Sequence, residues 1–175
     1  MRTRRLVPAD APAYRALMLA AYAQHPDAFT SMVAERAALP LAWWAARFST
    51  HPQPPSIVLG VFEDEALVAV TGLSFESRPK TRHKAKLFGM YVSPAFRQRG
   101  LGRKLVEAVL AEARARDGVR LVQLTFTHRN TAARSLYEGC GFVEFGLEPY
   151  ALAMDEGFAS LVHMWCDLDA GPGDA

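Results

Sequence analysis

The chain has 175 residues; 50% are hydrophobic, 22% are charged, and the formal net charge is +2. This length and composition fit one globular domain with a sizeable core and argue against disorder. The small net charge disfavours a nucleic-acid partner, and no apolar run is long enough to span a bilayer. The two cysteines make no disulfide framework, and Pro8 interrupts the basic N-terminus before a secretory segment forms. We therefore expect a cytoplasmic protein.

The front of the chain predicts one short strand followed by helices. Residues 3–7 are a short strand, and residues 11–24 are rich in Ala and Leu at helical spacing. Residues 33–48 are one or two further helices, with Pro40 as the break. The apolar side of that segment holds Trp43, Trp44 and Phe48. These aromatics pack in the core or, as the alternative, line an acceptor pocket.

The centre of the chain predicts a hairpin followed by a strand–helix–strand unit. Residues 56–62 and 66–75 are β-rich runs joined by a short acidic turn. Residues 85–92 form the next strand, and residues 100–117 carry an apolar stripe of helical period. Residues 119–127 alternate in the manner of a strand. Two strands joined by a helix should be parallel with a right-handed crossover.

The end of the chain predicts a short helix and two strands. Asn130 is a good N-cap for a helix ending near residue 138. Residues 140–145 and 161–168 complete the sheet, whereas the Gly/Pro tail at 170–175 should be loosely ordered. We therefore expect one domain over residues 1–169, with a mixed α/β sheet and helices on both faces.

The turn between the strand at 85–92 and the helix at 100 is the most informative stretch, because glycines and basic residues meet there. The first turn of a helix leaves amide donors unpaired, and the helix dipole adds partial positive charge, so this turn suits a phosphate. The third glycine and the acid of a dinucleotide-binding fingerprint are missing, as is the hydroxyl of a Walker P-loop. We expect a phosphorylated ligand at residues 97–104.

Two motifs together resemble one family. Arg97-x-x-Gly100-x-Gly102 is similar to the acetyl-CoA signature Gln/Arg-x-x-Gly-x-Gly/Ala of the GCN5-related N-acetyltransferase (GNAT) superfamily. The segment from Asn130 to Phe142 resembles that family's Asn-x-x-Ala-x-x-x-Tyr-x-x-x-Gly-Phe pattern, at the expected distance downstream. The resemblance implies a mostly antiparallel seven-stranded sheet. This sheet would be splayed open between the strand at 85–92 and the strand at 119–127.

The resemblance also implies an enzyme that transfers an acetyl group from acetyl-CoA to a primary amine by direct attack in a ternary complex, without a metal. The pantetheine arm would pair with the backbone of Met90, Tyr91 and Val92, as a peptide does in β-augmentation. Asn130 and Ala133 would also contact the cofactor. Backbone and side chains around the glycines would meet the diphosphate: Arg97, Gln98, Arg99, Gly100, Leu101, Gly102, Arg103 and Lys104.

By the same resemblance, Tyr137 would donate a proton to the departing thiolate. From the residues alone, we favour a core aromatic that packs against Phe142. The general base is open. Thr125 stands where the ribosomal-protein N-terminal acetyltransferases of this family carry an acid. The remaining candidates, besides no dedicated base at all, are Glu76, His128, Glu144 and Glu148.

The acceptor is not specified by any motif, and we favour a small molecule. The alternatives are a protein or peptide N-terminus, or an acyl-CoA-binding sensor that keeps the fold without turnover. The sequence itself does not specify the oligomeric state; homodimers formed through sheet edges are common in the family that it resembles.

Overall fold

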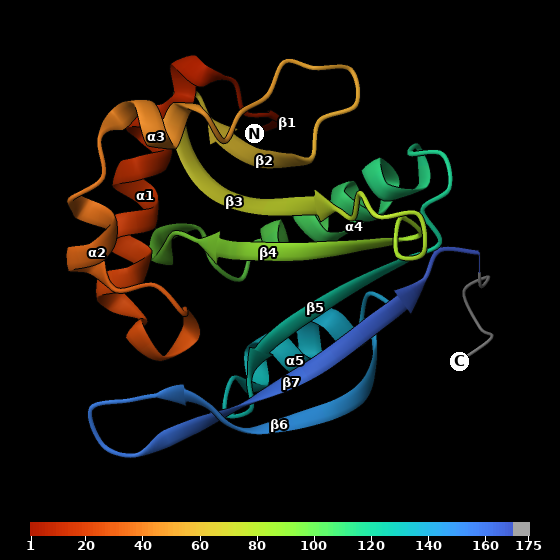
Figure 1. The fold of residues 1–175 in the computed structure, drawn as a ribbon. Coiled ribbons are helices and arrows are strands. Elements are labelled where there is room, and N and C mark those ends of the chain that lie inside the picture. Colours follow the sequence, from red (N-terminus) through yellow and green to blue (C-terminus); the bar gives the residue numbers. More distant parts are fainter. Residues whose placement is uncertain (170–175) are drawn as a thin grey trace.

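The computed structural model describes residues 1–169, so the tail expected at 170–175 lies outside the described residues. One sheet holds the strands β1 (Arg2–Arg5), β2 (Ser56–Glu63), β3 (Ala66–Phe75), β4 (Lys84–Val92), β5 (Leu121–Thr127), β6 (Val143–Ala153) and β7 (Phe158–Asp167). The seven strands follow the order β1-β2-β3-β4-β5-β7-β6, and every neighbouring pair except β4–β5 is antiparallel (Figure 1). The predicted mixed, mostly antiparallel sheet is confirmed.

The front of the chain supplies the helices on one face. They are η1 (Pro8–Asp10), α1 (Ala11–Gln24), η2 (Pro26–Ala28), α2 (Val33–Ala37) and α3 (Leu41–Ala45). Pro40 is the N-cap of α3, so the break predicted at this proline is confirmed. Trp44 and Phe48 are 0% and 4% exposed and belong to one cluster with Tyr14 and residues of β2, β3 and β4. The core alternative is therefore the right one for Trp44 and Phe48.

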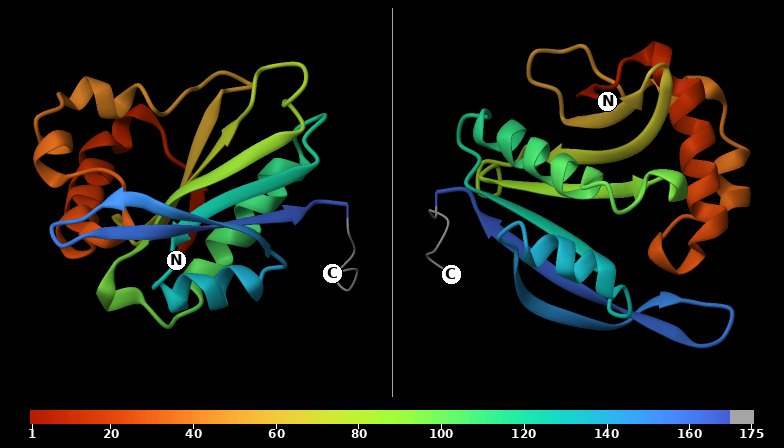
Figure 2. Two further views of the ribbon diagram at one scale, coloured as in Figure 1. Left: turned by 60° about the horizontal axis from the view of Figure 1, so that its bottom comes forward. Right: turned by 180° about the vertical axis from the view of Figure 1, so that it is seen from behind.

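The opposite face is covered by α4 (Leu101–Arg114) and α5 (Thr131–Glu138), which lie side by side when the molecule is seen from behind (Figure 2). The predicted stripe of α4 is confirmed, because Leu105, Val109 and Ala113 are fully buried against the sheet. Gly118 follows the helix in the left-handed conformation, with φ of 81°. The helix itself ends earlier than predicted, at Arg114 with Ala115 as its C-cap, so Gly118 belongs to the turn beyond it and does not end α4 directly.

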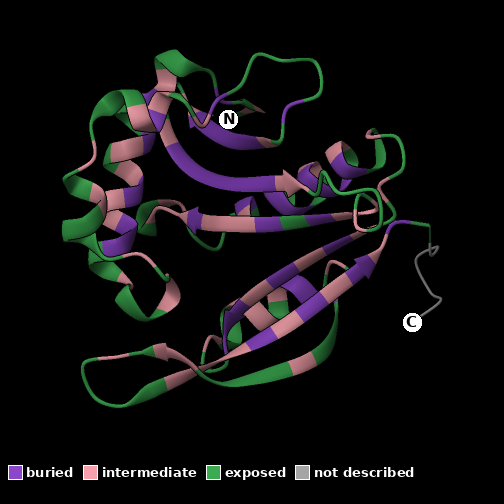
Figure 3. Ribbon diagram, viewed as in Figure 1, coloured by how far each residue is buried: buried purple, intermediate pink, exposed green. Residues whose placement is uncertain are grey.

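The last hairpin is longer than predicted. The strands expected at 140–145 and 161–168 are wrong in extent. β6 continues to Ala153 and β7 already begins at Phe158, so both strands reach closer to the connecting turn than predicted. β6 is an edge strand, largely exposed (Figure 3), and irregularities interrupt its register at Glu144/Gly146 and Glu148/Leu152. An exposed strand with bulges loses the apolar alternation that marks a strand in a sequence.

Within residues 1–169, no helix is long and apolar enough to cross a membrane.

Candidate active site

The sheet opens between β4 and β5. The two strands pair only at their beginnings, Lys84–Lys86 against Leu121–Gln123, and then diverge (Figure 1). From residue 87 onward, no described strand pairs with the β5-facing edge of β4. Parallel strands that part in this way leave backbone donors and acceptors free along both inner edges. The split expected from the resemblance is therefore present.

A bulge lies in β4 at the point where the sheet has opened. Val70 of β3 pairs with Tyr91, whereas Gly72 pairs with Phe88, so β4 holds one extra residue between these positions. Gly89 takes up the irregularity with φ of 62°, a conformation that glycine adopts without strain. A bulge bends its strand and changes where the following backbone groups point. Here the bulge changes the direction in which the backbone N–H and C=O groups of residues 90–92 point.

The side chains that follow the bulge are used for packing. Met90 and Val92 pack against the cluster on the α4 side, and Tyr91 is 5% exposed in the cluster on the α1 side. The Tyr91 hydroxyl donates a hydrogen bond to Gln24 Oε1 at 3.0 Å. These residues can therefore offer a ligand mainly their backbone groups.

The loop before α4 presents a row of free amides. Between η3 (Pro94–Phe96) and the first turn of α4, no backbone or side-chain acceptor within residues 1–169 receives the N–H groups from Gln98 to Arg103. Gln98 and Gly100 both have positive φ, 59° and 74°, and Arg99 lies between them. Successive N–H groups in such a turn converge on one concavity that suits an anion. We call residues 97–102 the glycine loop.

The two glycines of this loop serve different purposes. Gly100 is the left-handed N-cap of α4, and a Cβ built on it would meet no atom within 4 Å. A Cβ on Gly102 would lie 3.1 Å from Leu136 Cδ2 of α5. Gly100 therefore shapes the loop, whereas Gly102 lets α4 and α5 approach each other closely.

The basic side chains of this region mostly have protein partners. Arg97 donates from Nε to the Val92 carbonyl at 3.1 Å, and its Nη2 lies 2.8 Å from His25 Nε2. Arg103 donates to the Gly139 carbonyl at 2.8 Å, at the end of α5. The Arg99 guanidinium lies over the Phe96 ring, 5.1 Å from its centroid. The guanidiniums thus support the loop, and the free amides are its open donors.

Asn130 acts as the predicted cap of α5. Its Oδ1 accepts a hydrogen bond from the Ala133 amide at 3.0 Å. That contact fixes the side chain at the end of β5 and uses the carbonyl oxygen, which leaves the Nδ2 donors for another partner.

Tyr137 lies in α5, enclosed by aromatic rings. It is 5% exposed, and its ring centroid lies 5.8 Å from those of both Phe126 and Phe142. Its hydroxyl makes no hydrogen bond to another described residue. Burial, with a smaller contribution from Cys140, raises the pKa of Tyr137 above its ordinary value. The ring is therefore a core residue, and the hydroxyl is a protonated donor.

The candidate bases are scattered. Glu76 follows β3 beside Lys84, at the paired end of β4. Glu144 is paired with Arg134 of α5, and Glu148 accepts from His163 at 2.9 Å. Only His128 among them lines a cavity at the open end of the split.

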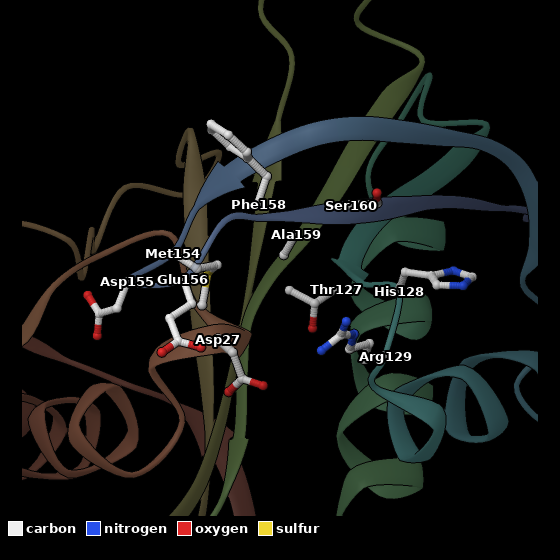
Figure 4. A pocket seen from close by; sticks show the side chains of 10 residues that line it. All are labelled: Asp27, Thr127, His128, Arg129, Met154, Asp155, Glu156, Phe158, Ala159 and Ser160. Atoms are coloured by element: carbon white, nitrogen blue, oxygen red, sulfur yellow. The ribbon is translucent and has the colours of Figure 1, made fainter.

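That cavity lies where the split opens to solvent and has a volume of about 550 Å³. Its walls come from η2, from the end of β5 and the turn after it, and from the β6–β7 hairpin tip with the start of β7 (Figure 4). The polar lining side chains include Asp27, Thr127, His128, Arg129, Asp155 and Glu156. This size falls within the range of roughly 300–1,000 Å³ that is typical of small-molecule sites.

Sequence reasoning missed the bulge and most of the cavity. A lone glycine inside the β4 pattern is a known sign of a bulge, so Gly89 could have been found. The cavity residues other than His128 stand in loops, in η2 or at the ends of strands without a motif, and they meet only because three distant segments converge.

Comparison with known proteins agrees with this geometry. The model of the acetyltransferase (GNAT) family matches residues 15–142. The chain belongs to the GNAT family. The fold also matches the structure of yncA from Salmonella typhimurium with its cofactor acetyl-CoA, at a TM-score of 0.78 and 24% identity, over 100% of this chain and 99% of that one.

Two curated relatives match parts of the chain. A ribosomal protein bS18-alanine N-acetyltransferase of Salmonella typhimurium is 44% identical over 61 residues, 35% of this chain and 40% of the relative. A mycothiol acetyltransferase of Salinispora tropica is 30% identical over 142 residues, 78% of this chain and 42% of the relative. The chain thus spans half or less of the curated relatives that it matches.

Proposed function

We propose that this GNAT protein is an N-acetyltransferase that uses acetyl-CoA to acetylate the primary amine of a small molecule. The observation that carries the proposal is the row of free amides from Gln98 to Arg103 beside an open sheet edge. An amide row at a helix N-terminus suits a diphosphate, and an unpaired strand edge suits an extended amide chain. Coenzyme A has both chemical parts in one molecule.

In the proposed complex, the diphosphate accepts hydrogen bonds from the glycine loop and from the amide of Arg103. The pantetheine arm pairs with the backbone of Met90, Tyr91 and Val92, beyond the bulge at Gly89. Arg97 keeps the loop in position through Val92 and His25. Asn130 and Ala133 contact the arm from the β5 side.

The proposed reaction is a direct attack. The neutral amine nitrogen attacks the thioester carbonyl; the C–N bond forms, and the C–S bond breaks. The Tyr137 hydroxyl gives its proton to the departing thiolate, and the amine loses its proton to a base or to water. The Tyr137 hydroxyl is protonated at neutral pH, because the ordinary tyrosine pKa of 10.0 already lies well above 7 and burial raises the pKa further. His128 is our first candidate base, since it lines the cavity.

A thiol-release assay with acetyl-CoA and an amine panel tests the proposal. We expect thiol release that depends on an amine, together with an acetylated amine of the expected mass. Binding of coenzyme A without thiol release for any amine or peptide would favour the sensor instead. Release with peptides alone would favour a protein acceptor.

We also propose a homodimer and a cytoplasmic location. The edge strand β6 exposes Val143, Phe145 and Leu147 to 44%, 53% and 50%. An exposed apolar edge of this kind is suited to pairing with a second sheet. Sedimentation at several concentrations measures the oligomeric state.

A further inference from the structure

The cavity at the open end of the split has walls of unequal charge. Asp27 of η2 and the adjacent Asp155 and Glu156 of the β6–β7 turn stand on one side, and Arg129 lies across from them (Figure 4). No ion pair within 4.0 Å joins any of these groups to another described residue. The carboxylates outnumber the guanidinium, so the cavity carries an excess of negative charge at neutral pH.

A second observation marks this cavity as a place for a ligand. Thr127, the last residue of β5, is 4% exposed and lines the cavity. Its hydroxyl points into the cavity (Figure 4) and has no hydrogen-bond partner within residues 1–169. The residue is almost entirely buried and the cavity is the side on which its hydroxyl can still find a partner, so a polar group of a ligand in the cavity can hydrogen-bond to it.

The place of the cavity relates it to the reaction. Thr127 ends the strand that forms one edge of the split, and Asn130, which caps α5, follows three residues later. An acceptor in the cavity therefore lies next to the edge along which the pantetheine arm is proposed to run. Asp27 belongs to η2, which follows α1 after His25, so the helical layer supplies one carboxylate of the acidic wall and the β6–β7 turn supplies the other two.

We infer that the acceptor carries a second cationic group in addition to the amine that is acetylated, as in an aliphatic diamine or polyamine. This inference rests on the proposed function and names its substrate class. The carboxylates of Asp27, Asp155 and Glu156 hold the ammonium group that does not react, and the Thr127 hydroxyl accepts from the same molecule. The three acidic residues are exposed, but they stand together at one cleft, and a cleft lined mainly by one sign of charge attracts a cation more strongly than single surface acids do.

Calorimetry with three small probes tests the inference. 1,4-Diaminobutane, 1-aminobutane and 4-aminobutanoate are titrated at low salt into the protein saturated with coenzyme A, and also into the free protein. We expect the diamine to bind about fivefold or more tightly than the monoamine. The zwitterion should bind more weakly than the diamine. Glu156→Gln should reduce the preference for the diamine, and Asp117→Asn, beyond the C-terminus of α4, should leave it unchanged.

The outcomes separate this inference from the proposed function. Failure of coenzyme A itself to bind overturns the proposed function. If coenzyme A binds and the monoamine or the zwitterion binds as tightly as the diamine, the charge inference alone is overturned. Absence of measurable binding for all three probes overturns it as well, and so does an unchanged preference in Glu156→Gln.

Discussion

Arg97 and His25 join the glycine loop to the C-terminus of α1, with 2.8 Å between Arg97 Nη2 and His25 Nε2. The same guanidinium donates to the carbonyl of Val92, where β4 ends. One side chain therefore links the helical layer of the front face, the open strand and the loop of free amides. This link makes the loop's geometry depend on residues that do not touch the proposed diphosphate.

The link gives the first prediction. His25→Ala removes one hydrogen-bond partner of the Arg97 guanidinium. It removes none of the backbone N–H groups of the glycine loop. We expect coenzyme A to bind about two- to tenfold more weakly, as the loss of one hydrogen bond implies, with kcat little altered. Calorimetry and steady-state kinetics measure the two effects. His83→Ala, in the loop before β4, is the control; equal affinities in both variants would refute the role of the link.

Gly100 and Gly118 form a matched pair for the second prediction. Both have a left-handed backbone, with φ of 74° and 81°, and a Cβ on either would meet no atom within 4 Å. Substitution by Ala should therefore cost each about 1–2 kcal/mol of folding free energy. Only Gly100→Ala should also weaken coenzyme A binding, by about tenfold, because it distorts the amide row. A parallel loss of affinity in Gly118→Ala would mean that general destabilisation is the cause.

Tyr137→Phe is the third prediction. Because the hydroxyl has no partner among the described residues, its removal should leave the melting temperature and the affinity for coenzyme A nearly unchanged. Turnover should fall by a factor of about 10²–10⁴, as expected for loss of a general acid. Tyr14→Phe, a buried tyrosine of the opposite face at 3% exposure, should keep full turnover. Undiminished turnover in Tyr137→Phe would leave this residue a purely structural role.

A pH effect on stability is the fourth prediction. The Arg4 guanidinium, at 2.6 Å, holds the pKa of Asp10 below its usual range, and the Val7 amide adds a hydrogen bond. A lowered pKa stabilises the fold above the unfolded pKa, and this stabilisation is lost as pH falls through the folded pKa. Asp10→Asn should therefore cost about 1 kcal/mol at pH 7 and progressively less below pH 4.

Urea unfolding at pH 7 and at pH 3 measures this difference. Glu107→Gln is the control, because the Arg103–Glu107 pair is 3.8 Å apart with side chains 53% and 61% exposed. It should be nearly neutral at both pH values. A cost for Asp10→Asn that does not change with pH would contradict the assignment to the ion pair.

The parts of the fold that the sequence predicts are those with a strong local pattern. The stripe through Leu105 and Val109 places α4, and Asn130 caps α5, as their spacing and residue types indicate. The amide row of the glycine loop follows from the same kind of signal. Only the start of β6 is predicted, because the strand is exposed and bulged and its side chains show little of the apolar alternation of a strand that faces a core.

The residues that line the proposed acceptor cavity could not be predicted from the sequence, for a different reason. Asp27, Thr127 and Glu156 come from three segments, and each looks like an ordinary loop or strand-end residue in its own surroundings. Their relation exists only once β5, the β6–β7 turn and η2 are packed together. A charged residue in a loop has no period or spacing that marks it as part of a cavity.

The central claim is that the backbone N–H groups of the glycine loop and of Arg103 donate hydrogen bonds to the diphosphate of coenzyme A. Amide NMR tests this claim most directly. In a titration of the ¹⁵N-labelled protein with coenzyme A, the resonances of residues 98–103 should show the largest downfield proton shifts. Pantetheine, which lacks the diphosphate, should leave these resonances in place while it shifts those of residues 90–92. Saturation with coenzyme A without a shift at residues 98–103 would contradict the account.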